Sequence, residues 1–144
     1  MSMATHQLAP NFHRLEFRCR GATCCSNSAP IALDLVYYLQ QFRDHLTALR
    51  GVDTPLFVSS GFRCITYNTQ REWTPHSQHT LGLAADITRP APMNINDFHR
   101  ALLDWQANPF RGIGLYDWGL HLDIRAEPPA HWDQRSGDPS NANH

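Results

Sequence analysis

The longest helical repeat of apolar residues lies between Pro30 and Gly51, and it limits the folds open to the chain. Apolar side chains recur there at spacings of three and four, which places them along one face of a helix. They are Leu35, Val36, Leu39, Phe42, Leu46 and Leu49. Proline before the stripe and glycine after it favour a helix from Ile31 to about Leu49. Such a face must be covered by another element.

Four short runs are typical of strands, because they are rich in apolar residues and bounded by turn formers. We expect these strands to cover the helix. They are "PLFVSS" (55–60), "LAADIT" (83–88), "GIGLY" (112–116) and "LHLDIR" (120–125). A second helix is predicted for "NINDFHRALLDWQ" (94–106), which opens on a capping asparagine. We expect an α+β fold in which an antiparallel β-sheet packs with helices.

The whole chain of 144 residues has the length of one domain. We expect residues 1–144 to form this single domain, with its core at about 12–125 and a flexible tail at 126–144. The first thirty residues are expected to be irregular, with the apolar anchors Phe12, Leu15 and Phe17. Residues 65–80 show no period and are expected to form a long loop, a feature that is usually functional.

Composition excludes several classes of partner. The apolar share is 42% and the formal net charge is -1, so a disordered chain or a nucleic-acid-binding surface is not expected. No run reaches the ~20 apolar residues of a membrane span. The first residues lack the basic leader and apolar run of a signal peptide, so we expect synthesis in the cytoplasm. We expect a monomer.

The four cysteines are Cys19, Cys24, Cys25 and Cys64. Their spacing matches neither a Cys-x-x-Cys pair nor a zinc-finger set, which argues against a metal knuckle. Adjacent cysteines rarely bond each other, and a bridge from Cys19 or Cys24 to Cys64 needs an oxidising compartment. We favour reduced, packed thiols.

His79 and Asp86 lie seven residues apart in "SQHTLGLAAD". A helix would separate them by roughly 10 Å, too far for both to bind one ion. A turn at Gly82 would remove that obstacle, since glycine tolerates left-handed conformations. Asp86 alternates with Ala85 and Ile87, as a carboxylate facing a site from a strand would. The alternative is a surface histidine and a capping aspartate.

"GLHLDIR" divides its residues between two strand faces, with His121, Asp123 and Arg125 together on one of them. Such a polar face lies toward solvent or toward a site. Two histidines with Asp86 would make a zinc site of three protein ligands, which leaves a fourth position open as in catalytic sites.

Three blocks follow one another along the chain: "SSGFRC" with "YN" after it, "SQHTLGLAADI", and "GIGLYDWGLHLDIR". Their order and spacing resemble the Ser-Gly-Tyr-Arg, Ser-x-His-x-x-Gly-x-Ala-x-Asp and Gly-x-Gly-x-Tyr…His-x-Asp blocks of the zinc D-alanyl-D-alanine carboxypeptidase family. "FRCRGATCC" resembles the related phage endolysin peptidases. The resemblance covers roughly residues 12–125. It implies the fold shared by these peptidases and hedgehog proteins, with the zinc site in a cleft on the sheet.

The resemblance also implies roles for single residues. His79, Asp86 and His121 would be the ligands of a zinc ion, and Arg63 would contact the substrate or a polarised carbonyl. Ser77 and Asn68 would line the site or hydrogen-bond its ligands. The family's glycine pair before Ser77 is replaced here by "TQREWTPH", whose bulky residues would reshape the substrate cleft.

The family places a carboxylate shortly before the last histidine, often three positions upstream, where it takes the proton of the attacking water. That position holds Trp118 here, and Asp117 is the nearest acid. In an extended strand Asp117 shares a side with His121, so we favour it as the general base. Asp123 is the alternative, or else the residue that orients an imidazole.

Together these features predict a zinc peptidase that hydrolyses peptidoglycan stem or cross-link peptides, as a carboxypeptidase or an endolysin endopeptidase. Synthesis without a signal peptide would suit a phage or prophage protein that is released onto the cell wall. The alternative function is a non-catalytic module of the same fold that binds zinc or docks on the wall. The bond cleaved is left open.

Overall fold

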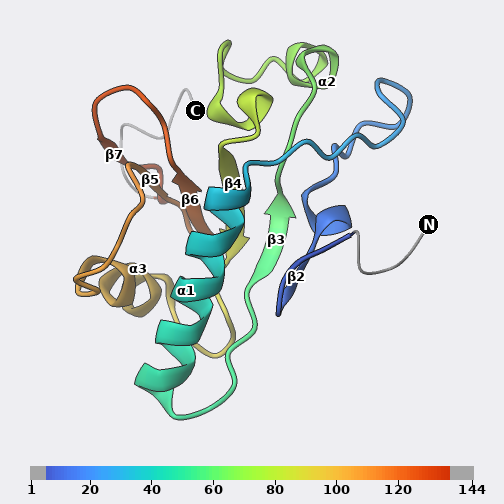
Figure 1. Cartoon of the computed structure of the whole chain (residues 1–144). Coiled ribbons are helices and arrows are strands. Elements are labelled where there is room, and N and C mark those ends of the chain that lie inside the picture. Colours follow the sequence, from blue (N-terminus) through green and yellow to red (C-terminus); the bar gives the residue numbers. More distant parts are fainter. Residues whose placement is uncertain (1–5, 137–144) are drawn as a thin grey trace.

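The computed structural model describes residues 6–136, and Figure 1 shows their arrangement. A long helix, α1 (Leu33–Arg50), lies across one face of a five-stranded sheet. The sheet consists of β3 (Phe57–Ser60), β4 (Ala84–Thr88), β5 (Gly112–Leu115), β6 (Gly119–Asp123) and β7 (Ala130–Asp133). The shorter elements are β1 (Gln7–Ala9), β2 (Phe12–His13), η2 (Arg14–Phe17), α2 (Ile65–Gln70), η3 (Gln78–Leu81) and α3 (Ile95–Leu103). The predicted α+β class is confirmed.

The strand order in the sheet is β3-β4-β6-β5-β7. The first four strands pair antiparallel, as predicted, whereas β7 adds to β5 in parallel. The central pair β4 and β6 aligns Asp86 with His121 directly across the ladder. Residues that face each other in this way have neighbouring side chains, so the register brings two predicted ligands together.

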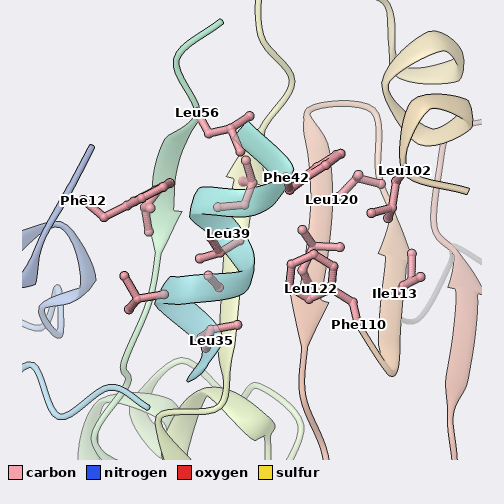
Figure 2. Packing of buried hydrophobic residues seen from close by; sticks show 14 of the residues in the cluster. Phe12, Leu35, Leu39, Phe42, Leu56, Leu102, Phe110, Ile113, Leu120 and Leu122 are labelled. Atoms are coloured by element: carbon pink, nitrogen blue, oxygen red, sulfur yellow. The ribbon is translucent and has the colours of Figure 1, made fainter. Parts of the chain in front are cut away.

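The core lies between α1 and the sheet, as Figure 2 shows for the labelled side chains. Leu35, Leu39 and Phe42 point from α1 toward the strands, where Leu120 and Leu122 of β6 meet them. All five side chains are fully buried. The apolar period of the helix therefore identified the buried face correctly over most of its length.

Two predicted apolar anchors lie at the surface instead. Leu49 is 60% exposed, because it belongs to the last turn of α1, beyond the edge of the sheet's cover. Leu15 is 50% exposed, since the short η2 helix turns only Phe17 into the core, where Phe17 packs against Phe12 of β2.

Three segments predicted to be irregular contain regular structure. The first of them, residues 1–30, includes β1, β2 and η2, which are too short to show an apolar period. The segment 65–80, predicted to be a loop, includes α2 and most of η3, each begun by a side chain that caps it: Cys64 and Ser77. These helices are too short to show an apolar period. The predicted flexible tail is wrong for β7, which pairs with β5 over four residues. The remainder from 137 onward lies outside the described residues. Within the described part of the chain, no helix combines the length and the apolar character needed to cross a membrane.

Candidate metal centre

Three elements bring the predicted ligands together. Asp86 and His121 lie opposite each other on β4 and β6, and His79 lies on η3, which precedes β4. The Ser77 hydroxyl accepts a hydrogen bond from the His79 backbone N–H and begins η3. Gly82 ends η3 in the left-handed conformation, with φ at 72°. The turn predicted at Gly82 is therefore present, and it returns the chain so that His79 faces Asp86.

The ligand atoms converge on one carboxylate oxygen. His79 Nε2 lies 3.1 Å from Asp86 Oδ1, and His121 Nδ1 lies 3.2 Å from the same atom. All three residues are buried, with 2%, 8% and 7% of the surface of His79, Asp86 and His121 exposed. One ligand atom from each lies within 4.8 Å of the others. These separations approach the roughly 3.4 Å expected between ligands of a tetrahedral zinc ion with bonds of about 2.1 Å.

The second nitrogen of each ring has an acceptor outside the cluster. His79 Nδ1 donates to the Gly61 carbonyl at 2.7 Å, and His121 Nε2 donates to Asp123 Oδ2 at 2.7 Å. In the neutral rings the nitrogens that face Asp86 consequently carry lone pairs. Two lone pairs and a carboxylate oxygen then meet at one point, which requires a cation or shared protons between them. This donor set fits zinc.

Charge coupling within the cluster is strong. Burial alone raises the pKa of Asp86, but the neighbouring histidines outweigh it and hold that pKa far below its usual range. Burial lowers the pKa of His79 below its ordinary value. Burial also acts to lower the pKa of His121, yet hydrogen bonds to Asp123 and Asp86 raise it overall. Asp86 is thus a carboxylate at every physiological pH, as a metal ligand must be.

Arg63 lies beside the cluster, and its predicted contact with substrate stays a prediction. Its Nη2 donates to Asp86 Oδ2 at 3.3 Å, and its Nε donates to Ser60 Oγ at 3.2 Å. Its guanidinium carbon lies 4.1 Å from the centre of the Trp73 ring. Arg63 therefore binds Asp86 Oδ2, whereas both histidines contact Asp86 Oδ1. Stacking on Trp73 fixes the plane of the guanidinium.

Asp123 is fully buried on β6 with both oxygens engaged. Besides His121, it accepts from Arg125 Nη2 at 2.7 Å and from Arg125 Nε at 3.0 Å. Burial works against its charge, but these hydrogen bonds hold the pKa of Asp123 far below its usual range. Such a carboxylate is suited to orienting His121 and is a poor proton acceptor.

Asp117 is exposed in the turn between β5 and β6. It therefore does not lie in the extended strand from which a shared side with His121 was predicted. Its carboxylate accepts hydrogen bonds from the backbone N–H and the hydroxyl of Ser136. Among the hydrogen bonds of the described residues, none joins Asp117 to the three candidate ligands. Its predicted role as base stays a prediction.

Asn68 is buried on α2, where its side-chain amide donates to the Thr74 carbonyl at 3.1 Å. It therefore holds the loop that carries Trp73, and any contact with substrate stays a prediction. Trp73 packs against Tyr67, and its ring lies under the Arg63 guanidinium. A bulky residue of the segment "TQREWTPH" therefore contacts Arg63 directly.

Sequence reasoning missed three residues of the surroundings. Gly61 contributes only a carbonyl, which no side-chain pattern reveals. Trp132 on β7 places its ring 5.0 Å from that of His121 and donates through Nε1 to the Tyr116 hydroxyl at 3.0 Å. The "GIGLY" block could have drawn attention to Tyr116, but β7 lay in the presumed tail.

One hollow in the described surface lies between α3 and β7 and contains none of the three candidate ligands. Its lining includes His99, His131 and Arg135. The part of the fold prediction that places the zinc site in a cleft therefore stays a prediction.

A family model described as Peptidase M15 matches residues 10–123, which include all three candidate ligands, Arg63 and Asp117. No curated protein matches the chain at a significant level.

Proposed function

The chain belongs to the peptidase M15 family, and we propose that it is a zinc-dependent hydrolase of peptidoglycan stem or cross-link peptides. Membership in this family supports a metallopeptidase that acts on a peptide. The proposal adds the cell-wall substrate, the D,D- or L,D-peptide bond and the residues that act. It also treats residues 1–144 as one peptidase domain that works on the wall after release, as an endolysin does.

The observation that carries the proposal is the convergence of His79 Nε2, His121 Nδ1 and an Asp86 oxygen while both outer ring nitrogens are engaged elsewhere. We assign these three residues as the zinc ligands. Three ligands leave one position open, whereas structural zinc sites are closed by four. When bound, zinc would polarise the scissile carbonyl and make water more acidic.

The chain's own side chains would position the substrate. Arg63 donates through Nη2 to Asp86 Oδ2 and through Nε to Ser60 Oγ, so three of its five N–H groups are left, on Nη1 and Nη2. We assign these to a carboxylate or carbonyl of the stem peptide, where the planar guanidinium fork gives two parallel hydrogen bonds. The stacking of Arg63 on Trp73 holds that fork ready before substrate arrives.

We assign proton transfer to Asp117. Asp123 is poorly suited, because Arg125 and His121 occupy its oxygens and keep its pKa low. Asp117 keeps ordinary solvent access in the β5–β6 turn, next to the strand that carries His121, and Ser136 fixes its orientation. It would accept a proton from the attacking water and pass it to the leaving amine.

The deciding experiment is digestion of defined muropeptides by the metal-loaded protein, with products identified by mass. We expect hydrolysis of a stem or cross-link peptide bond, loss of activity with a chelator, and recovery on addition of zinc. His121→Ala should abolish hydrolysis, whereas His131→Ala, an exposed histidine on β7, should not. Absence of cleavage on every muropeptide would overturn the enzymatic proposal and favour a non-catalytic module, which pull-down on purified sacculi would then detect.

Asp117→Asn tests the base separately. We expect turnover to fall by about 10²–10⁴-fold, the usual contribution of a general base, while zinc content stays unchanged. Asp104→Asn, at another exposed carboxylate, serves as the matched control. Full activity of Asp117→Asn would show that another group carries the proton.

A further inference from the structure

The four cysteines form a cluster that the peptidase proposal does not use. Their sulfur atoms all lie within 4.8 Å of one another. Cys24 Sγ is 3.7 Å from Cys19 Sγ and 3.8 Å from Cys25 Sγ. All four are free thiols in the structure. The sequence favoured reduced, packed thiols, and it gave no reason to expect all four of them at one point.

Two distant segments build the cluster. Cys19, Cys24 and Cys25 come from the loop after η2, while Cys64 caps α2 at its start. Backbone N–H groups point at two of the sulfurs: Cys64 N donates to Cys19 Sγ at 3.5 Å, and Tyr67 N donates to Cys64 Sγ at 3.3 Å. Such donors stabilise charge on sulfur, which neutral packed thiols do not need.

The sulfur spacing fits a metal site and is too long for a disulfide. A tetrahedral zinc ion with Zn–S bonds of about 2.3 Å separates its sulfurs by roughly 3.8 Å. A disulfide would require about 2.05 Å. Packing of neutral thiols in the core accounts for Cys19, which is fully buried, but not for the other three, which are partly exposed.

The loop is shaped for close approach to the cluster. A Cβ atom at Gly21 would lie 2.4 Å from Cys24 Sγ and 2.9 Å from the Tyr67 ring. Any side chain at this position would therefore push the loop away from α2. Glycine lets the backbone pass directly beside the sulfurs.

We propose that Cys19, Cys24, Cys25 and Cys64 bind a structural zinc ion as four thiolates, separate from the histidine–aspartate centre. Four soft ligands close the coordination shell, so this ion would have no position for substrate. Its role would be to tie the N-terminal segment to the start of α2.

The tie would act on the neighbouring centre through the backbone. Cys64 directly follows Arg63, whose own N–H donates to the His79 carbonyl at 3.2 Å. Two residues before Arg63, the Gly61 carbonyl accepts a hydrogen bond from His79 Nδ1. A metal that fixes Cys64 thus fixes the short segment that orients His79 and presents Arg63.

The test uses the full chain, purified under reducing conditions with metal supplied. We expect two zinc ions per wild-type chain by elemental analysis. Replacement of zinc by Co²⁺ should produce an ultraviolet thiolate-to-cobalt charge-transfer band, which nitrogen and oxygen ligands do not give. A double variant, His79→Ala with His121→Ala, should keep one metal and the full band, so this result stands even if the peptidase proposal fails.

Cys25→Ser combined with Cys64→Ser should lose the band and one metal. Ser28→Ala changes the same loop without touching a sulfur, since this hydroxyl donates to the Cys25 carbonyl, and it should keep both metals. A wild-type cobalt protein without the thiolate band would overturn the proposal, and so would a native mass that shows disulfides. Neither result depends on the folding of a variant.

Discussion

At the scale of single residues, each ring of the candidate centre owes its orientation to one acceptor outside it. The Gly61 carbonyl holds His79, and Asp123 holds His121. Outer acceptors of this kind fix the tautomer and raise the basicity of a ligand. Gly61 acts through its backbone, so Asp123 is the acceptor that a side-chain substitution can remove.

Asp123→Asn should weaken zinc binding by about 10–100-fold, because the amide is a weaker acceptor and leaves His121 less firmly oriented. Competition with a chromogenic chelator measures the change. Asp133→Asn is the matched control: Asp133 pairs with Arg135 at 2.7 Å, as Asp123 does with Arg125, but on β7. Equal zinc affinity in the two variants would refute the orienting role.

Arg63→Lys should lower kcat/KM by about 10²-fold and leave zinc content unchanged, since an ammonium cannot provide the planar fork. Steady-state hydrolysis of the preferred muropeptide measures the loss. Arg71 lies 5.1 Å from the centre of the same Trp73 ring, so Arg71→Lys controls for a general effect on the loop. Similar losses in both variants would assign the effect to the loop and not to Arg63.

At the scale of elements, the short η3 helix decides whether His79 reaches Asp86. Its end at Gly82 is also joined to α1, because the Ala32 N–H donates to the Gly82 carbonyl at 2.9 Å. A Cβ atom at Gly82 would lie 2.6 Å from the Pro30 carbonyl oxygen. The end of η3 and the entry to α1 must therefore move together.

Gly82→Ala should destabilise the fold by more than Gly51→Ala, and only Gly82→Ala should weaken zinc binding. Both glycines have φ near 70°, but nothing lies within 4 Å of a Cβ atom at Gly51. Gly51→Ala therefore carries only the conformational cost of about 1 kcal/mol. Urea unfolding and zinc titration of both variants measure the difference. Equal free energies of unfolding would show that the Pro30 contact yields freely.

At the scale of the whole molecule, aromatic side chains join α1 to the C-terminal half of the chain. Phe42 is fully buried and stacks with Phe98 and with Trp105 at 5.6 Å between ring centres. Its edge meets Phe110 at 6.3 Å. The position of α1 over the sheet thus depends on contacts between residues more than fifty positions apart.

Phe42→Ala should lower the free energy of unfolding by about 3–5 kcal/mol, the usual cost of removing a buried phenylalanine. Leu49→Ala on the same helix should change it by less than about 0.5 kcal/mol, since Leu49 is mostly exposed. Urea denaturation of the zinc-free proteins measures both. A large effect of Leu49→Ala would mean that its surface is covered in solution.

Local pattern was sufficient for the main elements, because apolar period and turn residues act over a few positions. It identified α1, α3 and the four strands of the antiparallel part of the sheet, and it set Asp86 and His121 facing away from the core. It failed for Leu15 and Leu49, whose exposure depends on how far the neighbouring elements extend. It also failed for the short elements β1, β2, η2 and α2, which are too short to show a period, and for β7, which depends on pairing with a distant strand.

The sequence by itself determined the α+β class and the residue types able to bind zinc, and its ordered blocks indicated the peptidase family. Only the tertiary structure decided which atoms meet. The turn at Gly82 brings His79 back toward Asp86, and the β4–β6 register places His121 opposite Asp86. The tertiary fold places Cys64 beside the loop that contains Cys19. These contacts join residues up to 45 positions apart in the sequence. Whether such distant residues meet is decided by the packing of the whole chain, because local preferences act over only a few positions.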